Sequence, residues 1–132
     1  MKDIRHPCHV VVTPVKNEED YISGLIDSMT NQSIIPERWV IVDDRSSDST
    51  VEIIKRACGS FEWIELVERN IIGDCDGTRS GKIASLFLTG LSECDFEWEY
   101  CSKIDADMIL PNDYFERIFQ YFEEDSNLGI AS

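Results

Sequence analysis

The chain has 132 residues with 12 basic and 26 acidic side chains, which gives a formal net charge of −14 at pH 7. This length and an apolar content of 42% fit one globular domain around a single hydrophobic core. The acidic charge argues against binding to nucleic acid and against docking on anionic lipid, because both need basic patches. A phosphate ligand is still compatible with this charge, since a bound divalent cation can reverse the sign locally.

The five cysteines are odd in number and show no C-x-x-C spacing, so we expect free thiols in a reducing compartment. The first residues lack the apolar core of a signal peptide, and no apolar run reaches the ~20 residues of a membrane span. These features predict a cytoplasmic chain without a membrane span.

The first predicted strand, residues 8–13, is a β-branched apolar run that is typical of a strand buried on both faces. We expect Pro14 to end this strand and Asn17 to cap a helix whose acidic first turn suits the helix dipole. The apolar side chains of this helix recur at amphipathic spacing, at Ile22, Leu25, Ile26 and Met29.

A second buried strand, residues 39–42, runs straight into an acidic and polar cluster at residues 43–48. The next four residues, Ser49–Glu52, match a capping box and predict the start of a helix that Gly59 ends. Residues 63–67 form the third predicted strand.

Residues 70–80 are predicted to be a loop, after which Gly81 and Lys82 begin another helical stretch. An alternating run then predicts a strand with one series of side chains on a single face: Phe96, Trp98, Tyr100, Ser102 and Ile104. Asp105 and Asp107 follow at once, and residues two apart in a strand point the same way. If the strand persists that far, the two carboxylates converge on a cation, and hard oxygen ligands favour Mg²⁺ or Mn²⁺.

Pro111 starts a last predicted helix, and residues 128–132 look like the beginning of one more strand. Strands alternate with helices throughout, which predicts a single α/β domain with a Rossmann-like, mostly parallel sheet and helices on both faces. Ligands of such sheets bind beyond the carboxyl ends of the strands. The polar residues 13–18, 43–48 and 105–107 collect there, and we expect them to form one site.

Other nucleotide-binding patterns fit less well. No G-x-G-x-x-G follows the first strand, and a P-loop would need glycine at Asp76 and a hydroxyl at Ile83. A receiver-like signalling domain remains an alternative on length and on the acidic pair Asp43 and Asp44. In receivers, however, that pair ends the first strand, whereas here it ends the second.

Four segments of the chain resemble glycosyltransferase family 2, whose members are inverting enzymes of the GT-A fold that use nucleotide-diphosphate sugars. These segments are residues 11–18, residues 40–50, Gly81-Lys82 and Asp105-Ala106-Asp107, and their order and spacing match from about residue 8 onward. The most specific part is V-D-D-x-S-x-D-x-T with a later D-x-D.

The resemblance implies that Thr13, Pro14 and Glu18 line the pocket for the base and ribose. It also implies that Asp44, and secondarily Asp43, accepts a hydrogen bond from the base. A carboxylate accepts and cannot donate, so it selects a base edge that donates, as in a UDP- or GDP-linked sugar.

By the same resemblance, Lys82 lies near the nucleotide or the diphosphate, although a lysine in the first turn of a helix can also be simply solvated. Asp105 would approach the ribose or the metal, and Asp107 would ligate Mn²⁺ or Mg²⁺. Such a cation neutralises the diphosphate and stabilises the leaving group. A plain polar turn is the alternative for this pair, because Asp is common where strands end.

The chain departs from the family in length, because the second half of family members supplies the acceptor pocket and the general base. No residue after Asp107 is a convincing base, and Glu123–Asp125 are more typical of solvated charges at a helix end. We therefore expect the N-terminal, nucleotide-sugar-binding part of a longer GT-A domain, with a sugar, lipid-phosphate or protein acceptor left open. A non-catalytic or truncated binding module is the first alternative, and we expect self-association through the C-terminal edge at residues 128–131.

Overall fold

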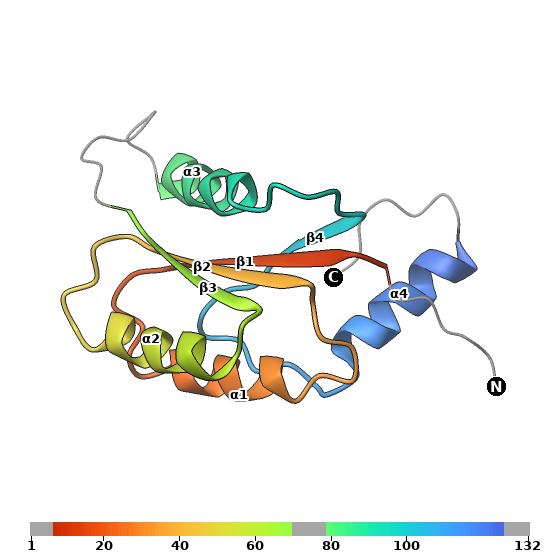
Figure 1. Cartoon of the computed structure of the whole chain (residues 1–132), viewed down its shortest axis with the longest axis horizontal. Helices are drawn as coiled ribbons and strands as arrows, with labels where there is room; N and C mark the ends of the chain where they lie inside the picture. The colour runs from red at the N-terminus through yellow and green to blue at the C-terminus, as the bar shows by residue number, and fades with distance from the viewer. Residues whose placement is uncertain (1–6, 70–78, 126–132) are drawn as a thin grey trace.

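The computed structural model describes residues 7–69 and 79–125. Within these ranges the strands are β1 (His9–Val15), β2 (Arg38–Asp43), β3 (Ile64–Glu68) and β4 (Tyr100–Lys103). The helices are α1 (Ile22–Thr30), α2 (Thr50–Ser60), α3 (Arg79–Ser92) and α4 (Tyr114–Glu124). The strands pair in parallel in the order β3-β2-β1-β4, and strands alternate with helices along the chain (Figure 1). The predicted α/β fold is confirmed.

Helices cover both faces of the sheet, with α3 on one face and α1 and α2 on the other (Figure 1). Successive side chains of a strand point to opposite faces. Val10 and Val12 of β1 therefore pack in a smaller core with Leu86 of α3, whereas Val11 packs in the larger core with α1 and α2. This division explains why the central strands are apolar at nearly every position.

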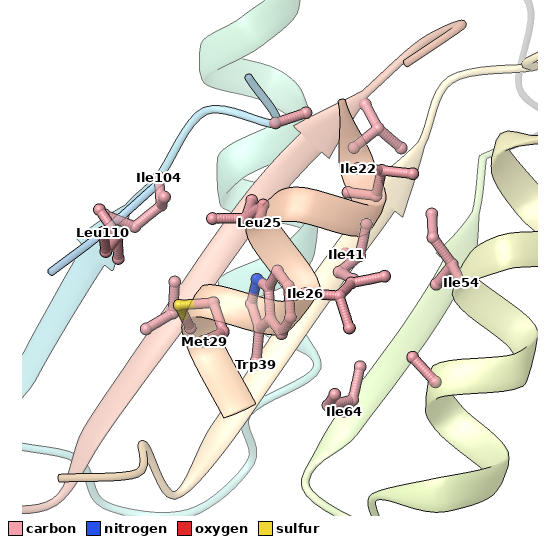
Figure 2. Close-up of a cluster of buried hydrophobic side chains, with 14 of the residues drawn as sticks. Ile22, Leu25, Ile26, Met29, Trp39, Ile41, Ile54, Ile64, Ile104 and Leu110 are labelled. Carbon is pink, nitrogen blue, oxygen red and sulfur yellow. The ribbon is translucent and has the colours of Figure 1, made fainter. Parts of the chain in front are cut away.

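The larger core forms between β2 and α1, as Figure 2 shows. The helix side chains predicted to face the sheet do so: Ile22, Leu25, Ile26 and Met29. Trp39 of β2 is fully buried beneath them, and its indole N–H donates a hydrogen bond of 2.9 Å to the hydroxyl of Thr13. Because a buried indole N–H needs an acceptor, Thr13 contributes to the core rather than to an open surface.

The prediction that Pro14 ends the first strand is wrong, because β1 continues to Val15. The carbonyl of Val12 accepts a hydrogen bond from Ile104 on the β4 side, and alternate residues of a strand bond to the same side. The backbone nitrogen of Pro14, which carries no hydrogen, therefore faces the β4 side. Pairing between β1 and β4 has already ended there, at the level of Val12. A proline at such a position costs no ladder hydrogen bond.

The prediction of one face for the residues before Asp105 is also wrong. Phe96 and Trp98 pack against the smaller core on the α3 side, whereas Tyr100 and Ile104 belong to the larger core. The strand itself begins only at Tyr100, so the chain changes faces before pairing begins.

Two helix boundaries differ from the sequence-based prediction. Gly59 does not end α2, which runs to Ser60, and α4 begins at Tyr114 rather than at Pro111. No helix in the described ranges has both the length and the apolar character needed to cross a membrane.

Four cysteines, Cys8, Cys58, Cys94 and Cys101, are free thiols, as predicted. Cys75, most of the predicted loop at 70–80 and the predicted strand and self-association edge at 128–132 lie outside the described residues.

Candidate functional site

A cavity of about 320 Å³ opens where β1 and β2 end against the beginning of α3. Val15 is in register with Asp43, and its carbonyl accepts a hydrogen bond of 2.9 Å from the N–H of Asp44. The loops that follow β1 and β2 therefore begin side by side. The cavity is lined by Pro14, Val15, Lys16, Glu18, Asp44, Lys82, Ile83 and Leu86.

Asp44 carries the main negative charge of this cavity, although its side chain is only 4% exposed. One carboxylate oxygen lies 2.9 Å from Nζ of Lys82, and the other lies 3.6 Å from Nε of Arg45. Burial alone would raise the pKa of Asp44, but the hydrogen bond and charge of Lys82, together with Arg45 and Lys16, hold it below its ordinary value. Asp44 is therefore an ionised acceptor at neutral pH.

Asp43 is buried but turns away from the cavity, into its own loop. Its carboxylate accepts hydrogen bonds from the Ser46 hydroxyl at 2.5 Å and from the Ser46 N–H at 3.1 Å. This closes a turn around Arg45, whose backbone is left-handed with φ of 58°. That conformation is uncommon for a residue other than glycine, and the bonds of Asp43 hold it.

The turn after β4 lies at the same end of the parallel sheet as the cavity. Burial, and then the charges of Asp107, Asp48 and Asp105, raise the pKa of Glu18. The acidic pair therefore lies close enough to Glu18 to repel its carboxylate. This proximity brings all three predicted polar clusters to one end of the sheet.

The pair Asp105 and Asp107 does not stand on a strand, because β4 ends at Lys103. Both aspartates are exposed in a turn in which the N–H of Met108 donates to the carbonyl of Asp105. Nζ of Lys103 lies 2.5 Å from a carboxylate oxygen of Asp105. The strand argument for their convergence is therefore wrong.

The donor chemistry of this turn nevertheless fits a divalent cation. No group of three or more His, Cys, Asp or Glu side chains is arranged to hold a metal within residues 7–69 and 79–125. Mg²⁺ does not require such a group, since proteins commonly bind it through one or two carboxylates together with substrate phosphates. Asp107 and Asp105 are two carboxylates of this kind in one exposed turn.

Among the predicted site residues, the structure brings Pro14, Glu18, Asp44 and Lys82 into one cavity wall. Thr13 lies in the core, and Asp43 supports the loop. Ile83 and Leu86 were missed by the sequence reasoning, and Val15 and Lys16, which lie within the predicted segment 13–18, were not assigned a role. Lys16 carried a signal, because it is a cation inside the first polar cluster, whereas Leu86 reads only as part of an apolar helix face.

Comparison with known proteins yields a family and several relatives. The family model described as "Glycosyl transferase family 2" matches residues 10–131. The poly(ribitol-phosphate) beta-glucosyltransferase of Bacillus spizizenii is 38% identical over 63 residues, which cover 46% of this chain and 10% of that protein. The chondroitin synthase of Pasteurella multocida is 26% identical over 125 residues, covering 95% of this chain and 12% of that protein.

Two solved structures share the fold. TarS of S. aureus (residues 1–349) in complex with UDP superposes with a TM-score of 0.69 at 20% identity, covering 94% of this chain and 38% of that one. The mannosyltransferase PcManGT from Pyrobaculum calidifontis, in complex with GDP-Man and Mn²⁺, gives 0.72 at 23% identity, covering 89% and 33%. This chain thus spans about a tenth of the curated relatives and about a third of these solved chains.

Proposed function

Because this chain belongs to glycosyl transferase family 2, we propose that it is the donor-binding part of a glycosyltransferase. We call the cavity wall residues Pro14, Lys16, Glu18, Asp44 and Lys82, together with Asp105 and Asp107, the donor site. One observation carries the proposal. A buried, ionised Asp44 and a lysine 2.9 Å away share one cavity wall at the carboxyl ends of β1 and β2, the place where parallel sheets bind ligands.

Each charge of this pair suits one part of a nucleotide-diphosphate sugar. The Asp44 carboxylate accepts from a donating base edge, such as uracil N3–H or guanine N1–H and N2–H₂. The ammonium of Lys82 offers three donors and a positive charge for the diphosphate. Support comes from the ligands of the solved neighbours, UDP in TarS and GDP-Man in PcManGT.

We assign the divalent cation, Mn²⁺ or Mg²⁺, to Asp107 with Asp105 as the second carboxylate. When bound there, the cation supplies charge neutralisation for the diphosphate leaving group. Lys103 holds Asp105 in place from within the chain, and the charges of the pair contribute to the raised pKa of Glu18, after its burial. The neighbour PcManGT was solved with Mn²⁺, which supports the choice of ion.

The proposed reaction is direct displacement at the anomeric carbon. An acceptor hydroxyl attacks from the face opposite the diphosphate, its proton passes to a general base, and the configuration inverts. Both carboxylates that line the cavity, Glu18 and Asp44, serve the donor in this assignment, so the base and the acceptor pocket are expected outside the donor site. The acceptor is a sugar, a lipid phosphate or a protein, and the free thiols fit a cytoplasmic location.

A receiver-like signalling domain is the wrong alternative, because the chain matches a transferase family over residues 10–131. A binding module without turnover differs from the proposed transferase only in activity. Transfer from the bound donor to any of a panel of acceptors would establish the transferase and exclude the binding module.

A calorimetric screen of this chain with UDP, GDP and CDP, each with Mn²⁺ and with EDTA, tests donor binding. We expect binding of UDP or GDP that strengthens with Mn²⁺. Asp44→Asn is the matched variant, because it keeps the size of the side chain and replaces one acceptor oxygen by a donor. Absence of heat from all three nucleotides, in both conditions, would overturn the proposal.

A further inference from the structure

The loops after β1 and β2 are joined by hydrogen bonds that cross between them. In five of these bonds a backbone N–H donates to a side-chain oxygen across the loops, and in a sixth the hydroxyl of Ser47 donates to Asn17 Oδ1 at 3.4 Å. The five bonds are Asn17 N–H to Ser46 Oγ (2.9 Å), Ser47 N–H to Asn17 Oδ1 (2.8 Å), Glu18 N–H to Thr50 Oγ1 (2.9 Å), Glu19 N–H to Asp48 Oδ2 (3.3 Å) and Ser49 N–H to Glu19 Oε2 (3.0 Å). We call this set the loop clasp.

The loop clasp explains two sequence predictions that are wrong. Asn17 does not cap α1, which follows Tyr21 without a side-chain cap, because its amide oxygen is used by Ser47. The capping box at Ser49 is also absent: the hydroxyl of Ser49 makes no cap, and Asp48 accepts the N–H of Thr50 instead. The side chain of Asn17 and the backbone N–H of Ser49 bond across the loops instead.

Asn17 occupies a position that few residues tolerate. Its φ is 52°, in the left-handed region where Asn is favoured among residues other than glycine. The same residue both donates to Ser46 and accepts from Ser47, so its backbone turn and its side chain fix the two loops together.

Thr50 is the inner anchor of the loop clasp. Its side chain is fully buried, its hydroxyl accepts the N–H of Glu18 at 2.9 Å, and it donates to Asp48 Oδ1 at 2.5 Å. Both functions of the hydroxyl are therefore used. A methyl group at this place would leave the N–H of Glu18 without its acceptor.

The sheet alone does not place Glu18. The last bond that follows the β1–β2 ladder joins Asp44 to Val15, and Glu18 comes after that pairing has ended. Like charges at Asp107, Asp48 and Asp105 also repel the Glu18 carboxylate from its position. Its place beside Asp44 in the cavity lining therefore needs a restraint, and the loop clasp supplies one.

We propose that Thr50 and Asn17 are positioning residues of the donor site, which hold Glu18 in register with Asp44 so that both meet one nucleotide. The inference rests on the proposed function and adds to it residues that do not line the cavity. It predicts that a substitution of Thr50 lowers nucleotide affinity because Glu18 is displaced, and not because the folded chain is less stable.

The test compares Thr50→Val, Thr50→Ser and Thr89→Val with the unmodified chain. Thr89 on α3 donates its hydroxyl to the carbonyl of Ser85, so its loss removes a hydrogen bond outside the donor site. The readouts are thermal unfolding and the Kd for UDP and GDP with Mn²⁺. We expect Thr50→Val to weaken the preferred nucleotide about tenfold, Thr50→Ser to stay within about twofold, and Thr89→Val to change only unfolding.

A double-mutant cycle with Glu18→Gln separates positioning from general damage. If Thr50 acts through Glu18, Thr50→Val has little further effect on Kd in the Glu18→Gln background, so the two changes are not additive. Should Thr50→Val fail to fold, Asn17→Gly replaces it, because glycine keeps the left-handed turn but loses the acceptor for Ser47. Asn17→Asp restores that acceptor and is expected to recover affinity.

Three results would overturn the inference. The first is unchanged nucleotide affinity in Thr50→Val or Asn17→Gly, and the second is full additivity with Glu18→Gln. The third is equal weakening by Thr50→Ser and Thr50→Val. A chain that binds no nucleotide at all would instead overturn the proposed function together with the inference, and this outcome is already visible in the unmodified protein.

Discussion

The two sides of the donor site are built differently. At the ends of β1 and β2, Asp44 is buried, paired with Lys82 and surrounded by hydrogen-bonded loops. In the turn after β4, Asp105 and Asp107 are exposed, and Lys103 is the cation that the structure places on Asp105. In the proposed assignment the base-reading side is held by contacts within the chain, whereas the metal side has two exposed carboxylates whose remaining partners would come from the substrate and water.

This difference suggests that the two sides of the donor site have separate roles in ligand binding. A preorganised acceptor selects the ligand without a further cost of ordering side chains. An incomplete cation site binds tightly only when the correct diphosphate is already present. The following changes can break or sharpen the comparison.

The largest effect is expected from Asp44→Ala, on the preorganised side. Loss of a charged acceptor opposite a buried donor costs about 1.5–3 kcal/mol, roughly 10- to 150-fold in Kd. Calorimetry with UDP, GDP and CDP should therefore show weaker binding and no preference among bases. Asp27→Ala, an exposed aspartate on α1, is the control and should bind as the unmodified chain does. Retained base preference in Asp44→Ala would contradict the role.

Gly90→Ala tests whether the preorganised side depends on close packing of α3. A Cβ at Gly90 would lie 2.5 Å from Cγ1 of Val12 and 3.1 Å from Cγ2 of Val42, so α3 must shift away from the sheet. We expect a loss of about 1–3 kcal/mol of unfolding free energy in urea. Weaker nucleotide binding should accompany it, because α3 carries Lys82.

Gly59→Ala is the matched control for that change. A Cβ at Gly59 on α2 meets no atom within 4 Å, so alanine should stabilise the chain by about 0.5–1 kcal/mol. Equal stability of the two variants would show that α3 is not closely packed on β1 and β2.

Asp107→Asn probes the incomplete side. Loss of one charged ligand should weaken Mn²⁺-dependent nucleotide binding at least about tenfold, or about 1.4 kcal/mol. Binding in EDTA should not change, because the residue lies outside the cavity lining. Asp105→Asn is expected to do less, since Lys103 already neutralises part of that charge. Identical nucleotide affinity with and without Mn²⁺ in both proteins would remove the metal assignment.

The smallest effect concerns the pH dependence of stability. The pKa of Glu18 is raised by burial and by Asp107, Asp48 and Asp105, so its ionisation disfavours the folded state. The penalty is absent below the ordinary Glu pKa of about 4.3, where the carboxyl is protonated in both states, and it develops as pH rises. Glu18→Gln should therefore unfold at a higher temperature than the unmodified chain at pH 7 and not at pH 3.5.

Asp44 should show the opposite sign. Its pKa is lowered, so its ionised form contributes stability above the ordinary Asp pKa of about 3.9, and that contribution is lost as pH falls through the lower folded value. Thermal unfolding of Asp44→Asn between pH 2 and pH 7 measures this. A Glu18→Gln curve parallel to that of Asp44→Asn would contradict the contrast.

The sequence predicted the fold because β-branched runs and helical spacing are local properties. These local patterns also show where each strand ends. Polar residues that follow the carboxyl ends of parallel strands must lie at the same end of the sheet. For this reason Glu18 and Asp44 were expected to lie together, whereas Lys82 was placed by the family resemblance; the cavity lining contains all three.

The assignments that failed depend on contacts between distant segments. Asn17 and Ser49 have good capping chemistry, but a neighbouring loop offers competing partners. Thr13 matches the motif, yet its side chain lies on the face where Trp39 needs an acceptor. Asp107 lies in a turn because β4 ends at Lys103. The alternation of apolar side chains in the sequence does not show where that strand ends.

The central claim is that a formed base-reading side meets a cation site completed by the ligand. The direct test is to measure Mn²⁺ binding to this chain with and without the nucleotide that binds best. The same measurement on Asp107→Asn corrects for Mn²⁺ that is bound by nucleotide in solution. We predict weak Mn²⁺ binding alone and at least about tenfold tighter binding with nucleotide, with the reciprocal gain in nucleotide affinity that linkage requires. Equally tight Mn²⁺ binding in both conditions would contradict the account.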